Sequence, residues 1–186
     1  MMTQIRPHLT IADLDALPED GQRYELIAGG LLVSRAPHIV HQFAISNLLY
    51  ALNEYLKRNP IGRAVPEPGV VLSEYDSVRP DIAYLTNERF FELLSGGKLY
   101  GAPDLVVEVL SAGAENERRD RNIKRQLYAR YGIKEYWIVN WQEANVEVYR
   151  LGEAELELVE TLTGEEELTS PILPSFTFKV ARIFDV

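Results

Sequence analysis

The sequence predicts an α/β fold built on a mixed central sheet. Residues 104–111, DLVVEVLS, carry apolar side chains on both faces, which is typical of a central strand covered on both sides. A stretch with helical spacing, 115–131, follows this run and ends before Gly132, and the apolar run 136–140 comes next. A strand, a helix and a strand in this order favour a parallel pair joined by a helical crossover.

Length and composition are typical of a soluble globular protein, and we expect residues 1–186 to form a single domain. The absence of cysteine excludes disulfides, thiolate nucleophiles and zinc–cysteine sites. No apolar run approaches the roughly 18 residues that span a bilayer. The N-terminus shows no basic segment followed by an apolar one, so we expect no secretion signal and a cytoplasmic protein without a membrane partner.

The net charge of −9 is unfavourable for non-specific binding to nucleic acid, although a local basic patch can override it. The densest basic patch lies within the helix 115–131. A solvated helix face paired with Glu115 and Glu117 is the alternative interpretation. The basic side chains are Arg118, Arg119, Arg121, Lys124, Arg125 and Arg130.

The N-terminal part predicts a short helix, a hairpin and a long helix. Thr10, with Asp13 three residues later, indicates a capped helix start. Residues 24–34 predict a β-hairpin about Gly29-Gly30, with Glu25 as either a surface or a site residue. Residues 38–58 predict a helix that places His41 on its apolar face, as a core histidine or a ligand.

The remaining segments predict further strands and one short helix. We expect the N-terminal hairpin and the C-terminal antiparallel strands to flank the central sheet. The expected strands are 62–65, 69–73, 78–85, 145–151 and 156–162, with a turn at 74–77, a helix at 87–95, and a polar turn from Glu165 before ILPSFTF.

Acids in apolar surroundings mark the candidate site. Glu108 lies within the central strand, and Asp81 lies in the neighbouring run VRPDIAYL. A buried carboxylate is costly unless a cation meets it, so the two acids are a natural pair for a hard divalent cation. In the next helix, Ile123, Leu127 and Tyr131 predict the buried face. Asp120 and Lys124 lie near it, either as site residues or as a surface ion pair.

Several segments, taken together, resemble the PD-(D/E)XK nuclease superfamily, and within it the bacterial restriction-endonuclease-like family. They are LPEDGQRYELIAGGLL, the helix beginning near His41, VRPDIAYL, GAPDLVVEVLS, the helix with Asp120 and Lys124, GIKEYWIVN and ILPSFTF. The resemblance implies a restriction-endonuclease-like αβββαβ core, a divalent metal and phosphodiester hydrolysis.

The resemblance also implies roles for individual residues. Asp81 matches the metal-binding aspartate and Glu108 the acid of the (D/E)XK element. Leu110 stands where the lysine of that element is expected, and Lys124 on the next helix is the matching candidate. Asp104 belongs to a second Pro-Asp pair, and its place at a strand start favours a turn or edge role.

The expected function is metal-dependent hydrolysis of DNA phosphodiester bonds. Asp81, Glu108 and a backbone carbonyl near Val109 would bind Mg²⁺ or Mn²⁺, and Lys124 would orient the attacking water or stabilise developing charge. His41, Glu25 and Asp120 would support these groups. Analogy with the superfamily favours a homodimer. A non-catalytic interaction module and a glycosidase carboxylate pair are the alternatives.

Overall fold

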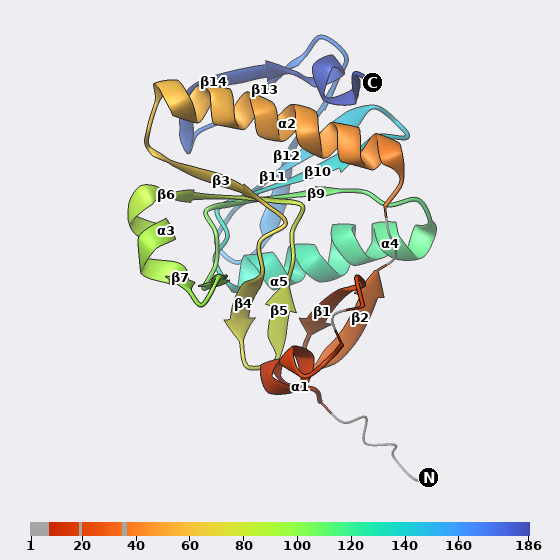
Figure 1. Ribbon diagram of the computed structural model, residues 1–186. Helices are drawn as coiled ribbons and strands as arrows, with labels where there is room; N and C mark the ends of the chain where they lie inside the picture. The colour runs from red at the N-terminus through yellow and green to blue at the C-terminus, as the bar shows by residue number, and fades with distance from the viewer. Residues whose placement is uncertain (1–7, 19, 35–36) are drawn as a thin grey trace.

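The computed structural model describes residues 8–18, 20–34 and 37–186. The first seven residues, which entered the expectation of no secretion signal, lie outside the described residues. The described strands form two mixed sheets and a small C-terminal sheet (Figure 1). The mixed α/β prediction is confirmed, with two six-stranded sheets in place of one. In the described ranges, no helix combines the length and apolar character that crossing a membrane requires.

The central sheet has the order β12-β11-β10-β9-β6-β3. As predicted, β9 lies inside the sheet with all of its residues buried, and it pairs in parallel with β10. On its other side β9 pairs antiparallel with β6, with Val107 opposite Ile82. The bounds are β3 Gly62–Pro66, β6 Ile82–Thr86, β9 Leu105–Val109, β10 Glu135–Asn140, β11 Asn145–Leu151 and β12 Leu156–Thr163.

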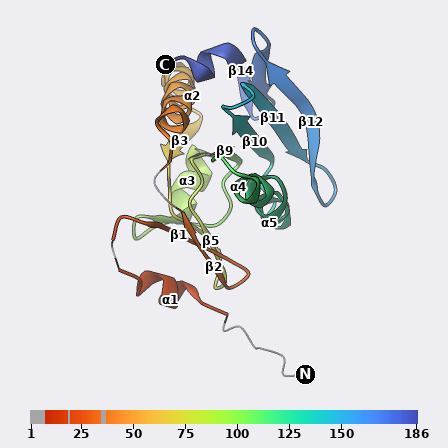
Figure 2. The ribbon, with the colours of Figure 1, turned by 90° about the vertical axis from the view of Figure 1, so that its right-hand side faces the viewer.

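Helices cover both faces of this sheet (Figures 1 and 2). The long helix α2, Ile39–Arg58, packs Leu48 and Leu52 in one core cluster with the odd-numbered β9 residues, such as Val107. On the opposite face, β9 directs Val106 and Glu108 toward a second helix, which runs from residue 114 to residue 130. Strand alternation therefore places Glu108 on the face opposite α2.

The second sheet has the order β2-β1-β5-β4-β8-β7 and packs beside the first. The predicted hairpin is present as β1 and β2, and the predicted helix α1 has the complete capping box of Thr10 and Asp13. The bounds are α1 Ile11–Asp15, β1 Arg23–Ile27, β2 Gly30–Ser34, β4 Val70–Ser73, β5 Asp76–Val78, α3 Asn87–Leu93, β7 Leu94–Ser95 and β8 Lys98–Tyr100.

The segment 78–85 was predicted as one strand, and this prediction was wrong. The chain leaves β5 at Val78, passes Pro80 and enters β6 at Ile82, so the two strands belong to different sheets. The predicted turn 74–77 accordingly includes the start of β5. Proline cannot donate a ladder hydrogen bond, which explains a break at this point. The break places Asp81 where the two sheets meet.

The C-terminal segment completes the α2 side of the core. Strands β13, Glu167–Ser170, and β14, Leu173–Lys179, form the two-stranded sheet and lead into a 3-10 helix, Val180–Phe184. Leu168, Phe176 and Ile183 join the core cluster of α2. This segment supports the long helix from the side opposite the candidate site.

Gly62 at the start of β3 provides a test of the packing between β3 and β6. A Cβ atom at this position would collide with the backbone oxygen of Leu85 and the ring of Tyr84. We expect Gly62→Ala to lower the free energy of unfolding by about 2 kcal/mol or more, measured by urea denaturation. Gly69→Ala is the control, because its new Cβ would meet Lys98 Cγ at an ordinary 3.4 Å. Equal stability of both variants would contradict this account.

Candidate active site

Asp81 and Glu108 converge on a pocket of about 290 Å³ between the two sheets. Asp81 directly precedes β6, and Glu108 lies in the adjacent strand β9. The amide of Val109 donates a hydrogen bond of 2.7 Å to Asp81 Oδ2, which fixes the first acid beside the strand of the second. Asp81, Glu108, Val109 and His41 all line the pocket. The role of the Val109 carbonyl as a metal ligand stays a prediction.

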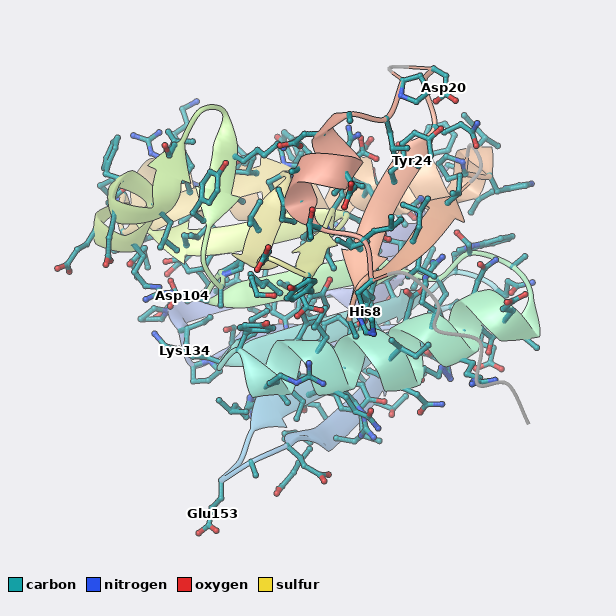
Figure 3. The ribbon with its side chains drawn as sticks, turned by 90° about the horizontal axis from the view of Figure 1, so that it is seen from below. His8, Asp20, Tyr24, Asp104, Lys134 and Glu153 are labelled. Carbon is teal, nitrogen blue, oxygen red and sulfur yellow. The ribbon has the colours of Figure 1, made fainter. Side chains whose placement is uncertain are left out.

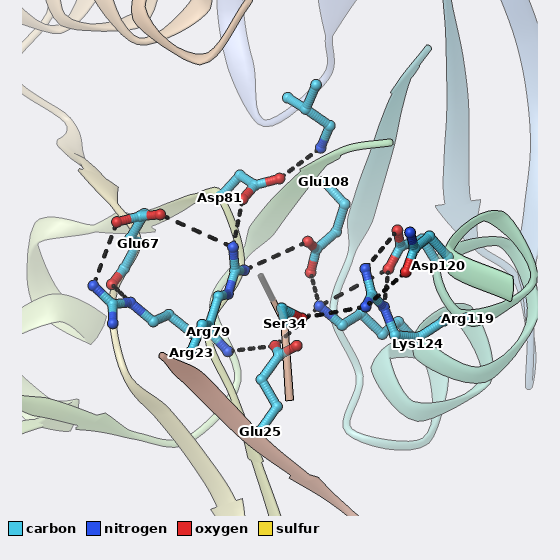
Figure 4. Close-up of polar contacts among 12 residues, drawn as sticks. Arg23, Glu25, Ser34, Glu67, Arg79, Asp81, Glu108, Arg119, Asp120 and Lys124 are labelled. Atoms are coloured by element: carbon cyan, nitrogen blue, oxygen red, sulfur yellow. Dashed lines mark hydrogen bonds and ion pairs between the residues drawn. The ribbon is translucent and has the colours of Figure 1, made fainter. Parts of the chain in front are cut away.

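Arg23 in β1 lies between the two acids, and the sequence-based prediction missed it. Its Nη1 lies 2.9 Å from Asp81 Oδ1, and its Nη2 lies 3.9 Å from Glu108 Oε2 (Figure 4). The available signal was its spacing from Glu25. Residues two apart in a strand share a face, so strand alternation places Arg23 and Glu25 on the same side of β1.

Lys124 lies on the side of Glu108 away from the pocket, and its ammonium contacts three acidic side chains. Its Nζ is 2.9 Å from Glu108 Oε1, 2.9 Å from Glu25 Oε1 and 3.9 Å from Asp120 Oδ1. Tyr128 donates a second hydrogen bond, of 2.6 Å, to the same Glu108 oxygen. The Lys124 side chain is 1% exposed and lies outside the described set of pocket-lining residues. The surface ion-pair alternative is therefore wrong for Lys124.

The helix that carries Lys124 has a π-helical turn. It consists of α4, Ala114–Arg118, the π turn Arg119–Lys124, and α5, Arg125–Arg130. Its inward side chains are Asp120, Lys124, Leu127 and Tyr128, whereas Ile123 is 37% exposed. The prediction that Ile123 belongs to the buried face was wrong. Glu25 of β1 and Glu108 of β9 form ion pairs with Lys124, so Lys124 rather than Ile123 faces the interior.

The supporting residues divide into two groups. Glu25 is 1% exposed and also accepts a 2.8 Å hydrogen bond from the Arg79 amide, which excludes a surface role. Asp120 binds Arg119 at 3.0 Å and, like Glu25, lies on the Lys124 side of the site. His41 lies on the pocket side, with Nε2 3.5 Å from Asp81 Oδ2. Its buried Nδ1 finds no hydrogen-bond partner among the described residues.

Asp104, the aspartate of the second Pro-Asp pair, lies elsewhere. It accepts hydrogen bonds from the Thr86 amide at 3.0 Å and from Lys134 Nζ at 2.7 Å. Figure 3 shows Asp104 and Lys134 beside each other near the edge of the molecule. The contacts fit the expected turn role, because the carboxylate ties the starts of β9 and β10 to the end of β6.

The ionisation of the acids follows from their surroundings. Burial would raise the pKa of Asp81, but the bond to His41, the charge of Arg23 and the Val109 amide hold that pKa well below its usual range. Burial raises the pKa of Glu108 to about 7 against the opposing effect of Lys124, and Asp81 adds to the increase. Burial also opposes the charge of Lys124, yet Glu108 and Glu25 raise its pKa above the ordinary value. A permanently charged Lys124 can donate hydrogen bonds but cannot act as a base.

The raised pKa of Glu108 makes stability depend on pH. The folded chain holds this proton up to about pH 7, whereas an ordinary glutamate has a pKa of 4.5, so the folded state binds the proton more tightly. The free energy of unfolding must then fall as pH rises between these values. Relative to Glu108→Gln, we expect the free energy of unfolding of the wild type to fall across this window, measured by urea denaturation. Parallel pH profiles of the two proteins would contradict the assignment.

The donor set fits a hard divalent cation in part. Two carboxylates and one imidazole face a single pocket, and Mg²⁺ typically takes one or two carboxylates together with water and substrate oxygens. Among the described residues, no cluster of three or more histidine and acidic side chains forms a complete ligand set. The residues therefore fit a site completed by water and substrate rather than a closed protein cage.

The mixed α/β architecture is that of the restriction-endonuclease-like nuclease fold, and comparisons with known proteins agree. The chain matches the Uma2 family model, described as "Putative restriction endonuclease", over residues 11–181, and it belongs to this family. The predicted family resemblance is thereby confirmed, and membership supports a nuclease. A comparison with curated proteins finds no match.

A solved structure also shares the fold. It is described as a "putative nuclease belonging to DUF820 from Anabaena variabilis ATCC 29413", determined at 1.96 Å resolution. The TM-score is 0.77 at 22% sequence identity, and the match covers 95% of this chain and 97% of the other. At this identity the likeness shows the fold alone.

Proposed function

We propose that this chain is a metal-dependent endonuclease that hydrolyses phosphodiester bonds in DNA. One observation supports the proposal: Asp81, just before β6, and Glu108, in the neighbouring strand β9, face one pocket together with arginines. Membership in the restriction endonuclease family supports the same chemistry. The cytoplasmic location and the homodimer are parts of the proposal that rest on sequence pattern and on analogy with the superfamily.

The residues have distinct roles in this proposal. Asp81 and Glu108 would hold Mg²⁺ or Mn²⁺, with the Val109 carbonyl as a further ligand and His41 beside Asp81. When bound, such an ion polarises the scissile phosphate and lowers the pKa of a bound water. Arg79 and Arg119 line the same pocket and would neutralise phosphate oxygens.

Lys124 would act through Glu108. Its ammonium contacts Glu108 Oε1, and the positive charge favours the ionised carboxylate that a metal requires. Glu25 and Asp120 hold the ammonium from its other sides. From this position Lys124 would stabilise the negative charge of Glu108. It could orient a water in the pocket only after its ammonium moves beyond the Glu108 carboxylate.

An interaction module on the same fold is the second candidate. The observation that favours it is the internal neutralisation of the acids, because Arg23 already meets Asp81 and Lys124 already meets Glu108. A module of this kind would bind no metal at millimolar concentration and would cut no DNA.

The test of the proposed function is a cleavage assay on plasmid, single-stranded and branched DNA with Mg²⁺ or Mn²⁺. We expect cleavage that stops when a chelator removes the metal. Glu108→Gln is the matched variant, because it keeps the shape of the side chain and removes its charge. No metal binding and no cleavage of any DNA form by a folded wild type would favour the interaction module.

A further inference from the structure

The oxygen atoms of the two acids are not equivalent. Asp81 Oδ2 accepts from the Val109 amide at 2.7 Å and lies 3.5 Å from His41 Nε2. Glu108 Oε1 accepts from Lys124 at 2.9 Å and from Tyr128 at 2.6 Å. The remaining oxygens, Asp81 Oδ1 and Glu108 Oε2, both face Arg23. We expect a cation that bridges the two acids from the pocket to approach through these two oxygens, because the other two already accept hydrogen bonds from the protein.

Arg23 occupies that approach. Its two terminal nitrogens face one acid each, and a third carboxylate, Glu67, lies 3.9 Å from Nη1. The side chain is 19% exposed, and its buried Nε has no hydrogen-bond partner among the described residues. The charges of the acids therefore hold the terminal end of the guanidinium, whereas its buried Nε–H has no acceptor among the described residues. A planar guanidinium can meet two carboxylates at once, which an ammonium cannot do with the same geometry.

We propose that Arg23 is an internal counter-cation that competes with the divalent metal for Asp81 Oδ1 and Glu108 Oε2. This inference rests on the proposed function, since it assigns the same two acids to the metal. Without metal, Arg23 keeps the acids together by offsetting their repulsion. When metal binds, the guanidinium gives up at least one of its contacts, and the apparent metal affinity is lower by the cost of that exchange.

The direct test is Mn²⁺ titration by isothermal calorimetry in the absence of DNA. Arg23→Gln removes the competing charge, and we expect it to bind Mn²⁺ at least about tenfold more tightly than the wild type. Arg79→Gln is the matched control. Arg79 lines the same pocket, but its guanidinium pairs with Glu67 at 3.3 Å, so its loss removes no contact of Arg23 with Asp81 Oδ1 or Glu108 Oε2.

A second variant protects the test against misfolding. Arg23→Lys keeps a positive charge but lacks the two-pronged group, so we expect an affinity between those of the wild type and Arg23→Gln. Circular dichroism and urea denaturation establish that each variant is folded. Addition of Asp81→Asn to Arg23→Gln should remove the heat of binding, which locates the metal at these oxygens.

The outcomes separate the two proposals. Tighter binding in Arg23→Gln but not in Arg79→Gln supports competition by Arg23. Equal or weaker binding in folded Arg23→Gln overturns the competition and leaves the metal-dependent function in place. Absence of Mn²⁺ binding in every folded variant overturns both.

Discussion

Replacing Lys124 by methionine is expected to lower the free energy of unfolding by about 3–5 kcal/mol. The ammonium is the cation shared by Glu25 and Glu108, at 2.9 Å from each, and all three side chains are at most 3% exposed. Methionine fills a similar volume but leaves two carboxylates buried without it. Removing one partner of a buried ion pair costs far more than the pair contributes in total, because the remaining charge cannot be hydrated.

Urea denaturation at a pH above the pKa of Glu108, which is about 7, measures this loss, because Glu108 is ionised there. Lys179→Met is the control, because Lys179 forms a 2.7 Å pair with Glu165 at the surface, where both side chains are more than half exposed. Lys179→Met should lower the free energy of unfolding by at most about 1 kcal/mol. Adding Glu108→Gln to Lys124→Met should recover part of the stability, because one of the two stranded charges is removed. A loss below about 1 kcal/mol in Lys124→Met would mean that the acids are neutral in the folded chain.

The second large effect is expected for Asp81→Asn, which should reduce DNA cleavage by about a thousandfold. Asparagine keeps the shape of the side chain and an oxygen for the Val109 amide. It loses the charge that meets Arg23 and that would meet a metal. Initial rates on plasmid DNA at saturating Mg²⁺ give the comparison, with Mn²⁺ binding as the readout that does not depend on turnover.

Asp104→Asn is a closely matched control. Asp104 also follows a proline, is buried to 2% exposure and accepts a backbone hydrogen bond, yet its charged partners are Lys134 and Arg89. It should lose stability and retain cleavage within about threefold, because its charge lies outside the pocket. Equal loss of cleavage in both variants would remove Asp81 from the site. Unchanged cleavage in Asp81→Asn would do the same.

Local sequence patterns predicted much of the fold. The cap at Thr10 and the hairpin about Gly29-Gly30 depend on residues close in sequence, and both are present. The parallel pairing of β9 with β10 follows from the strand, helix and strand order, and it is also present. The predicted α/β class and the family resemblance are also confirmed. The split at Pro80 was also readable, since proline disfavours a continuous ladder.

The site was harder to predict because its contacts are distant in sequence. Arg23 lies 58 residues from Asp81, and strand alternation relates it only to Glu25. Helical spacing alone did not decide whether the Lys124 side chain lies at the surface or in the interior. Its buried position depends on acids of β1 and β9, and the spacing of residues within one helix carries no information about them. The convergence of charged groups from separate strands is a tertiary property.

The Val109 amide gives this site its own spectroscopic reporter. A backbone N–H bonded to a carboxylate has a proton chemical shift and an exchange rate that depend on the charge of that carboxylate. The Val109 amide donates directly to Asp81 Oδ2, the oxygen next to the one that meets Arg23. A single peak in a two-dimensional nitrogen–proton NMR spectrum can therefore follow the electrostatic state of the pocket, without any change to the sequence.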